Sequence, residues 1–299
     1  STATLSNWVL MAASFSLLGR VATAVGAELM KGAILLMDDT GYPVQDGIDG
    51  KLRKGRLWAM TDQEQVYYVF TDTKEGKNPA SFLKDYQGKL ILVDGGSEFN
   101  QVVEEKGLLR AGCWSHLRTY FFDARHHHPQ EAHQALCTIR DLFAVEAGLV
   151  EATPEVIQQV RNRDSRPLVD GLFQWIQGLS RTVRPKSQLG AAVNYALHGR
   201  SKFELFLDHP ELPIHNNRSE FALRGPVVGR KAWLFAGSEG GALAGSVMFT
   251  LLYSCRMQGL DPQEYLTDVL TRLPSHPVTS VHELTPRNWR LSREGWNRS

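Results

Sequence analysis

The chain has 299 residues, enough to bury a hydrophobic core in one large domain or two ordinary ones. Its 42% hydrophobic and 22% charged residues are typical of a soluble globular protein, and its net charge of +1 excludes an overall basic protein. Lys and Arg are nevertheless concentrated in residues 181–231 and after Pro286. The sequence therefore predicts local basic faces.

Three widely separated cysteines indicate a reducing, cytoplasmic location, because they are too few and too scattered for a disulfide framework. Near the N-terminus, residues 1–31 form the most apolar stretch, which Arg20 interrupts. Its helical spacing predicts one amphipathic packing helix and no membrane span. Because this helix begins almost at residue 1, we expect the chain to be part of a longer protein.

The next segment, residues 32–114, combines short apolar strands with helices. The predicted order is strand, strand, strand, helix, strand, helix, strand, over residues 32–40, 55–62, 65–72, 78–86, 88–96, 97–107 and 108–114. A tight polar turn separates the second and third strands, which predicts a hairpin. This order favours an α/β fold.

The rest of the chain is predicted to be mostly helical. Residues 115–210 form an all-helical insertion, with breaks at the prolines 129, 154, 167 and 185. In residues 211–274 we expect a helix from about Asn216 to Gly225–Pro226, a second from Glu239 to Met257 and a third from Pro262 to Leu273. Residues 275–299 predict an extended C-terminal arm.

Acidic side chains stand at the ends of two predicted strands, Asp38 or Asp39 on the first and Asp94 on a later one. If these strands join one sheet, the carboxylates meet, and a hard cation such as Mg²⁺ has to neutralise them. Glu220 is then the natural third ligand of a two-metal site. The alternatives are an ordinary turn acid at Asp94 and a surface ion pair between Glu220 and Arg224, one helical turn apart.

Blocks along most of the chain are similar to the transposases of the insertion-sequence-66 family. They include LLMDDTGYPV, GRLWAMTD, FLKDYQGKLILVDGGSEFN, GCWSHLRTYFFDA, LPIHNNRSEFALR and ELTPRNW, in this order from near Leu5 to Trp289. The most specific blocks carry Cys–Trp–x–His at Cys113 and Asn–Asn–x–x–Glu at Asn216. The resemblance implies a ribonuclease-H-like mixed sheet flanked by helices, with the all-helical insertion before the last catalytic residue.

The resemblance also implies a catalytic triad of Asp38, Asp94 and Glu220 that holds two Mg²⁺ ions, with Mn²⁺ as an alternative. The implied reaction is DNA strand cleavage and strand transfer on double-stranded transposon ends and target DNA, close to the nucleoid. A homodimer and accessory transposition proteins are the expected partners. The predicted DNA contacts are Arg218, Arg224, Arg230, Lys231, Asn216 and Asn217, and the predicted site-supporting residues are Asp39, Trp114 and His116.

The chain departs from the family pattern in four places. His215 stands where the family commonly has Asp, Phe221 where it often has Arg, and Asp39 where it tends to have Glu. The block DGGSEFN replaces a form that usually ends in Tyr–Asn. Two alternatives therefore stay open: a catalytically inactive or repurposed DNA-binding or assembly domain of the same fold, and a resolvase-like nuclease. Cys113 and His116 also have the spacing of a zinc-ligand pair, but a zinc site needs two more ligands, so we expect this segment to pack beside the active site instead.

Overall fold

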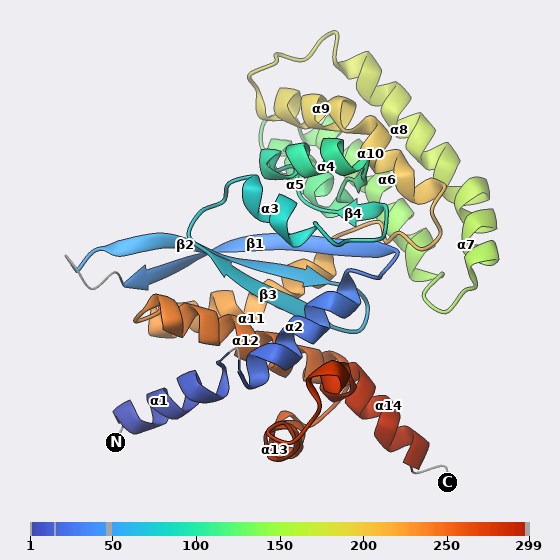
Figure 1. Ribbon diagram of the computed structural model, residues 1–299. Helices are drawn as coiled ribbons and strands as arrows, with labels where there is room; N and C mark the ends of the chain where they lie inside the picture. Colours follow the sequence, from blue (N-terminus) through green and yellow to red (C-terminus); the bar gives the residue numbers. More distant parts are fainter. Residues whose placement is uncertain (1, 15, 46–49, 297–299) are drawn as a thin grey trace. The chain divides into compact units, whose positions relative to one another are not determined.

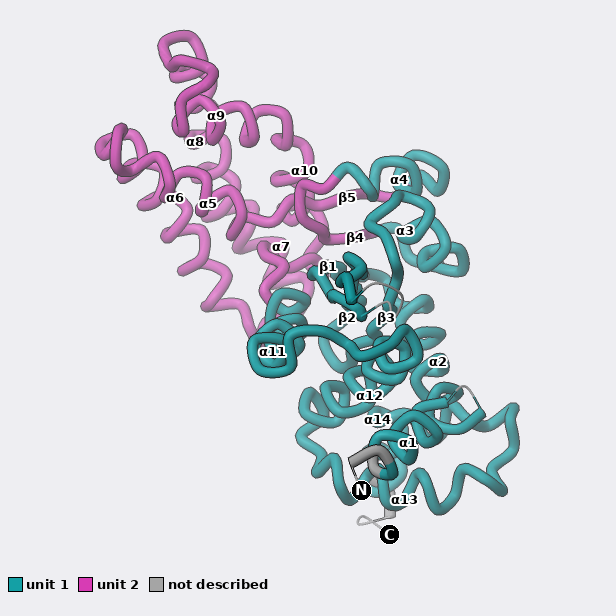
Figure 2. The backbone as a smooth tube through the Cα atoms, turned by 90° about the vertical axis from the view of Figure 1, so that its left-hand side faces the viewer, with its two compact units in different colours: residues 1–89, 97–107, 218–299 teal, residues 90–96, 108–217 magenta. Residues whose placement is uncertain are grey.

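The computed structural model describes residues 2–14, 16–45 and 50–296 (Figure 1). These residues form a mixed α/β structure with five strands and many helices. The chain divides into two compact units, and Figure 2 colours them separately. Unit 1 contains residues 1–89, 97–107 and 218–299, and unit 2 contains residues 90–96 and 108–217. Within the described residues, no helix is long and apolar enough to cross a membrane.

Unit 1 is built on an antiparallel three-stranded meander of β1 (Ile34–Gln45), β2 (Leu52–Thr61) and β3 (Val66–Thr71). The predicted hairpin is confirmed, and the first strand runs five residues beyond its predicted end at residue 40. Asp38 pairs with Ala59 and Asp39 with Trp58. Because side chains alternate between the faces of a sheet, the two aspartates face opposite sides.

Different layers cover the two faces of this meander. On the Ala59 face, Tyr68 and Phe70 of β3 pack with Ala222 and Leu223 of α11 (Asn217–Trp233). Helix α12 (Glu239–Met257) also lies on this side and was predicted with the same bounds. Figure 1 shows both helices beneath the strands. The opposite face holds the short α3 (Lys77–Phe82), the 3-10 turn η1 (Ser97–Phe99) and α4 (Asn100–Lys106). There Trp58 contacts the rings of Phe82 and Phe99.

Hydroxyl groups of α12 cap the backbone of β3. The Val66 N–H donates to Ser254 Oγ at 3.1 Å, and the Tyr68 N–H donates to Thr250 Oγ1 at 3.0 Å. The Ser254 hydroxyl donates in turn to the Val66 carbonyl at 3.1 Å. Strand edges need such partners when they are buried, because unpaired backbone groups are costly away from water. Helix α12 is therefore fixed to β3 by polar bonds as well as by apolar packing.

Helix α11 does not end at Gly225–Pro226, so that prediction is wrong. It continues to Trp233 with Pro226 inside it. A proline has no N–H to donate to the carbonyl four residues earlier, which here belongs to Ala222. The Tyr68 hydroxyl donates to that carbonyl at 2.6 Å and replaces the missing bond. Burial raises the pKa of Tyr68, so the hydroxyl keeps its proton and stays a donor at neutral pH.

We expect Tyr68→Phe to lower the free energy of unfolding by about 1–3 kcal/mol, because the buried Ala222 carbonyl would lose its donor. Chemical denaturation of the full chain measures this change. Tyr120→Phe is the matched control: Tyr120 is partly exposed, and its hydroxyl bonds no described residue. Its effect should stay within about 0.5 kcal/mol. Equal losses in the two variants would show that the Tyr68 bond does not support α11.

The chain termini in unit 1 differ from the predictions. The predicted helix from Pro262 to Leu273 is confirmed as α13 (Pro262–Arg272), but the expected extended arm is helical, with η4 (Val278–Leu284) followed by α14 (Pro286–Trp296). Their apolar residues Tyr265, Leu284 and Trp289 join a core with Leu18 and Leu251, which explains why the segment is ordered.

The predicted single N-terminal helix is two helices, α1 (Thr2–Ala12) and α2 (Leu18–Leu29). Only α2 buries a full apolar face, which includes Leu18, Val21 and Leu29. On α1, Trp8 and Met11 are 64% and 66% exposed. The packing role predicted for the whole stretch is therefore right for α2 and wrong for α1.

Unit 2 combines one parallel strand pair with a helical bundle. The pair is β4 (Leu90–Leu92) with β5 (Leu109–Ala111), both shorter than predicted. The helices are α5 (Trp114–Ala124), α6 (Pro129–Ala147), α7 (Pro154–Val160), the π-helical η2 (Arg161–Ser165), α8 (Arg166–Leu179), α9 (Gln188–His198), α10 (Arg200–Glu204) and η3 (Leu205–Leu207). The helical character predicted here is confirmed. The predicted break at Pro167 is wrong, because α7, η2 and α8 follow one another without a gap.

The π-helical turn supplies a buried arginine that ties the bundle together. Arg161 is 3% exposed, and its guanidinium donates to both carboxylate oxygens of Glu146, at 2.9 and 2.6 Å. It also donates to the carbonyls of Phe206, His209 and Leu212 at 2.7, 3.0 and 3.0 Å. One side chain thus links η2 with α6 and with the chain after α10.

Candidate active site

In unit 1, Asp38 lies on the face of the β-meander that α11, the helix of Glu220, covers. Asp38 shares its face with its partner Ala59, and Ala59 packs in one cluster with Ala222 and Leu223. Glu220 stands in the first turn of the same helix, just before these two residues. The Asp39 N–H donates to Asp38 Oδ1 at 2.8 Å and so orients the Asp38 carboxylate.

Asp39 lies on the other face, inside an ionic network. Its side chain is 2% exposed and pairs with Arg56 and, at 2.9 Å, with Lys74. Lys74 also contacts the Glu98 carboxylate at 3.0 Å. Burial lowers the pKa of Lys74, but its bonds to Asp39 and Glu98 outweigh this and raise it overall. Cations thus neutralise the Asp39 carboxylate on this face of the meander.

Sequence reasoning missed Arg56, Lys74 and Glu98. No local motif marks them, because their proximity depends on the strand register that places Arg56 diagonally beside Asp39. The alternation of side chains along a strand predicts that Asp38 and Asp39 lie on opposite faces of the sheet. It does not predict which of the two carboxylates pairs with Arg56 and Lys74. The network therefore supports the position of the neighbouring Asp38 through the backbone of β1.

Asp94 belongs to unit 2 and begins a tight turn directly after β4. The Gly96 N–H donates to Asp94 Oδ1 at 3.1 Å. The buried Arg110 donates to the backbone carbonyls of Asp94 and Gly96 at 2.5 and 2.7 Å. Asp94 thus takes part in a turn, as the alternative to a metal ligand predicted. The same turn holds the Asp94 carboxylate in place.

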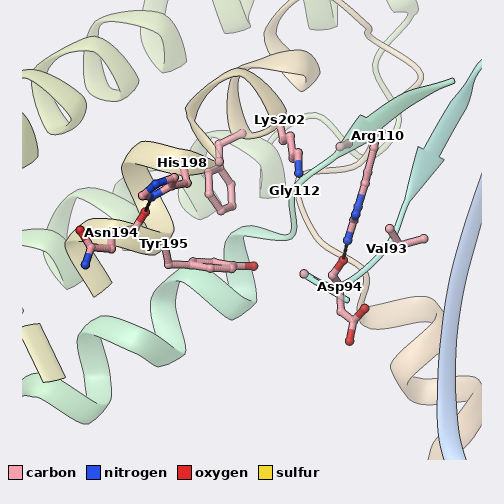
Figure 3. A pocket seen from close by; sticks show the side chains of 12 residues that line it. Val93, Asp94, Arg110, Gly112, Asn194, Tyr195, His198 and Lys202 are labelled. Carbon is pink, nitrogen blue, oxygen red and sulfur yellow. Dashed lines mark hydrogen bonds between the residues drawn. The ribbon is translucent and has the colours of Figure 1, made fainter. Parts of the chain in front are cut away.

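A cavity of about 320 Å³ within unit 2 opens beside Asp94. Figure 3 shows Tyr195 pointing from α9 toward the turn at Asp94, with Lys202 on α10 nearby. Burial chiefly raises the pKa of Tyr195 to about 12, so it remains a neutral hydroxyl. Burial, with a contribution from Arg110, lowers the pKa of Lys202. The cavity thus brings an aromatic ring together with the charged side chains of Asp94, Arg110 and Lys202.

The six predicted DNA contacts divide into exposed and structural groups. Arg218, Arg224 and Lys231 are exposed, and their side chains form no ion pair or hydrogen bond within the described part of the chain. The surface-pair alternative for Arg224 is therefore excluded in this structure. Arg230 is only partly exposed, and its guanidinium donates to the Gly41 carbonyl of β1.

The two asparagines are positioned by contacts within unit 2. Asn216 is fully buried, a position that favours a structural role over the predicted DNA contact. The Asn217 side chain accepts a hydrogen bond from Ser115 Oγ at 3.0 Å. His215 stacks on Phe143, and its Nδ1 accepts the Asn217 N–H at 3.4 Å. These contacts fix the start of α11, which gives His215 a physical role at a position where the family carries an acid.

Trp114 and Cys113 lie in the core of unit 2. The Trp114 ring packs edge-on against Phe173, Phe203 and Phe206, and its Nε1 donates to the Phe203 carbonyl at 3.1 Å. Cys113 is buried, and like Cys137 and Cys255 it forms no disulfide. His116 lies two residues after Trp114 in α5, and its backbone N–H donates to the Cys113 carbonyl at 3.1 Å. Trp114 thus supports the insertion by packing.

The donor chemistry of the triad suits a hard divalent cation. Asp38, Asp94 and Glu220 offer only carboxylate oxygens, the ligands that Mg²⁺ prefers and Mn²⁺ accepts. Arg56 and Lys74 pair with the neighbouring acid, Asp39.

Comparison with known proteins identifies the family. The sequence model of the "Transposase IS66 family" matches residues 1–244, and that of the "IS66 C-terminal element" matches residues 250–287. The chain belongs to the IS66 transposase family. This confirms the resemblance found in the sequence.

Similar IS66 relatives include two proteins of Sinorhizobium fredii. Uncharacterized protein y4hP is 30% identical over 280 residues, which cover 85% of this chain and 50% of y4hP. Uncharacterized protein y4qI is 29% identical over 282 residues, covering 88% of this chain and 52% of y4qI. The chain thus spans about half the length of these curated relatives.

Proposed function

We propose that the chain is the catalytic part of a DDE transposase that cleaves DNA strands and joins them to target DNA. The observation that supports this proposal is that α11, the helix of Glu220, covers the Asp38 face of the meander in a member of the IS66 family. Asp94, held in its turn by Arg110, would supply the third carboxylate. A ribonuclease-H-like arrangement of the strands is part of this proposal.

Asp38, Asp94 and Glu220 would together hold two Mg²⁺ ions, with Mn²⁺ as a substitute. When bound, such ions supply charge neutralisation and Lewis acidity at a phosphodiester. The chain's own residues provide the rigidity that this chemistry needs. The Asp39 N–H orients Asp38, Arg110 holds the Asp94 turn, and Tyr68 anchors the helix of Glu220.

The proposed substrate is double-stranded DNA. The exposed cations Arg218, Arg224 and Lys231 would bind backbone phosphates, which positions a duplex without reading its sequence. Because transposition acts on two DNA ends, we expect two copies of the chain to work together, with accessory proteins and close to the nucleoid.

The full chain incubated with supercoiled plasmid tests the proposal. With MgCl₂ or MnCl₂ we expect nicked plasmid with 3′-hydroxyl ends, and with EDTA no nicking. A labelled oligonucleotide with a free 3′-hydroxyl should become joined to the plasmid. DNA binding without nicking in either metal would favour the inactive-domain alternative. Cleavage restricted to branched DNA, with no joining, would favour the resolvase-like alternative.

A further inference from the structure

One face of α11 carries an exposed aromatic ring among unpaired cations. The packed face is formed by Ser219, Ala222, Leu223 and Pro226, which are buried. The opposite face carries Phe221, Arg224, Val228 and Lys231, all exposed. The spacing of three, four and three residues places these four side chains in one stripe along the helix.

Phe221 has no packing role that explains it. Its side chain is 66% exposed, and it contributes to neither of the apolar clusters that join α11 or α12 to the meander. A large exposed apolar side chain beside charged ones is often part of a binding surface. The neighbouring Arg224 and Lys231 have no acidic partner among the residues that the structure describes. The stripe is therefore suited to a ligand that offers both anions and apolar faces.

The position of the stripe links it to the proposed chemistry. Phe221 directly follows Glu220, and Arg224 lies one turn further along the same helix. A strand that reaches the Glu220 carboxylate would therefore pass Phe221 and Arg224. The rise from Phe221 to Lys231 is about 15 Å, or about four nucleotides of a stacked strand.

Nucleic acid matches this stripe better than a lipid surface does. A membrane-binding helix needs a wide apolar face, whereas Phe221 and Val228 are separated by Arg224 and followed by Lys231. Nucleobases stack on aromatic rings, and the phosphates between them bind Arg and Lys. Phe has no hydrogen-bonding group, so such stacking would not depend on the base sequence.

We propose that Phe221 stacks on an unpaired base next to the phosphodiester that is cut, while Arg224 and Lys231 bind the phosphates of the same strand. The chain then prefers DNA with unpaired bases at a duplex end over fully paired DNA. This inference rests on the proposed function, because it places the Glu220 end of α11 against substrate DNA.

Fluorescence anisotropy of the full chain tests the preference. The probes are a 30-base-pair duplex and the same duplex with its last three pairs replaced by mismatches, both in EDTA so that no cleavage occurs. Phe221→Ala should weaken binding to the mismatched duplex about 5- to 150-fold and change binding to the paired duplex less than about two-fold. Phe221→Trp should retain the preference. Phe221→Leu, which keeps an apolar side chain without a ring, should lose it.

Two further measurements separate stacking from charge. A 2-aminopurine placed at a mismatched position should be quenched by the unmodified chain and by Phe221→Trp, but not by Phe221→Ala. Arg224→Gln and Lys231→Gln should weaken binding to both duplexes and reduce the salt dependence by about one counterion each. Thermal unfolding of each variant checks the fold, which we expect to be unchanged because these side chains are exposed.

The stacking role is overturned if Phe221→Ala binds both duplexes as tightly as the unmodified chain does. It is equally overturned if Phe221→Ala loses the same amount of affinity for both duplexes. It is also overturned if the unmodified chain has no preference for unpaired bases. These outcomes are independent of nicking: a chain that nicks plasmid without the preference keeps the proposed function and loses this inference. A chain that has the preference but never nicks keeps a DNA-end-binding surface and loses the proposed catalysis.

Discussion

Glu220→Gln is expected to lower the rate of Mg²⁺-dependent DNA cleavage by about a thousand-fold while leaving the fold intact. The amide keeps the size of the side chain but removes the negative charge that would hold a cation. Metal ions contribute several kcal/mol to such transition states, and about 4 kcal/mol corresponds to a thousand-fold in rate. Asp38→Asn and Asp94→Asn should cause losses of the same order, measured as initial rates of plasmid nicking.

Glu104→Gln is the control for this series, since Glu104 is an exposed acid on α4 of the same unit. It should nick DNA at the rate of the unmodified chain. DNA binding in EDTA should survive in all of the carboxylate variants, because phosphate contacts do not require the metal. Cleavage that persists in Glu220→Gln would show that the assignment of the triad is wrong.

Arg161→Met should lower the free energy of unfolding of unit 2 by about 3–5 kcal/mol. The substitution leaves the largely buried Glu146 carboxylate and three backbone carbonyls without their shared donor. Loss of one partner of a buried ion pair typically has a cost of this size. Because whole proteins are stable by about 5–15 kcal/mol, the variant should unfold at a clearly lower urea concentration.

Two variants make the Arg161 test specific. Arg163→Met lies on the same π-helical turn, but the Arg163 side chain is 74% exposed, so the change should stay within about 0.5 kcal/mol. Arg161→Lys keeps the charge but lacks the planar fork that reaches several acceptors, and should be intermediate. Equal stability of the Arg161→Met and Arg163→Met variants would show that the hydrogen bonds of Arg161 do not stabilise unit 2.

The sequence was sufficient for elements whose signals are local. Two apolar segments separated by a polar turn predicted the hairpin of β2 and β3, and α12 was predicted with its observed bounds. The position of Asp38 at the end of an apolar run was also visible. The family resemblance then connected it with Asp94 and Glu220, and the IS66 sequence models confirm that family.

Other features depended on residues far apart in the chain. Pro226 is a strong stop signal, and it is overridden because the hydroxyl of Tyr68, 154 residues earlier than Ala222, supplies the missing donor. The Asp39 network likewise depends on strand register. From the sequence alone, the C-terminal segment is predicted to be an extended arm. In the structure its apolar residues pack against α2, more than two hundred residues earlier in the chain.

The interleaving of the two units has a consequence for how the protein is synthesised. Unit 1 is completed only by residues 218–299, which follow all of unit 2. Its core joins Leu18 to Leu251 and Trp289, so this core cannot close until Trp289 has left the ribosome. Contacts so distant in sequence form slowly, and the apolar face of α2 stays open meanwhile. The nascent chain should therefore depend on chaperones far more than the finished protein does.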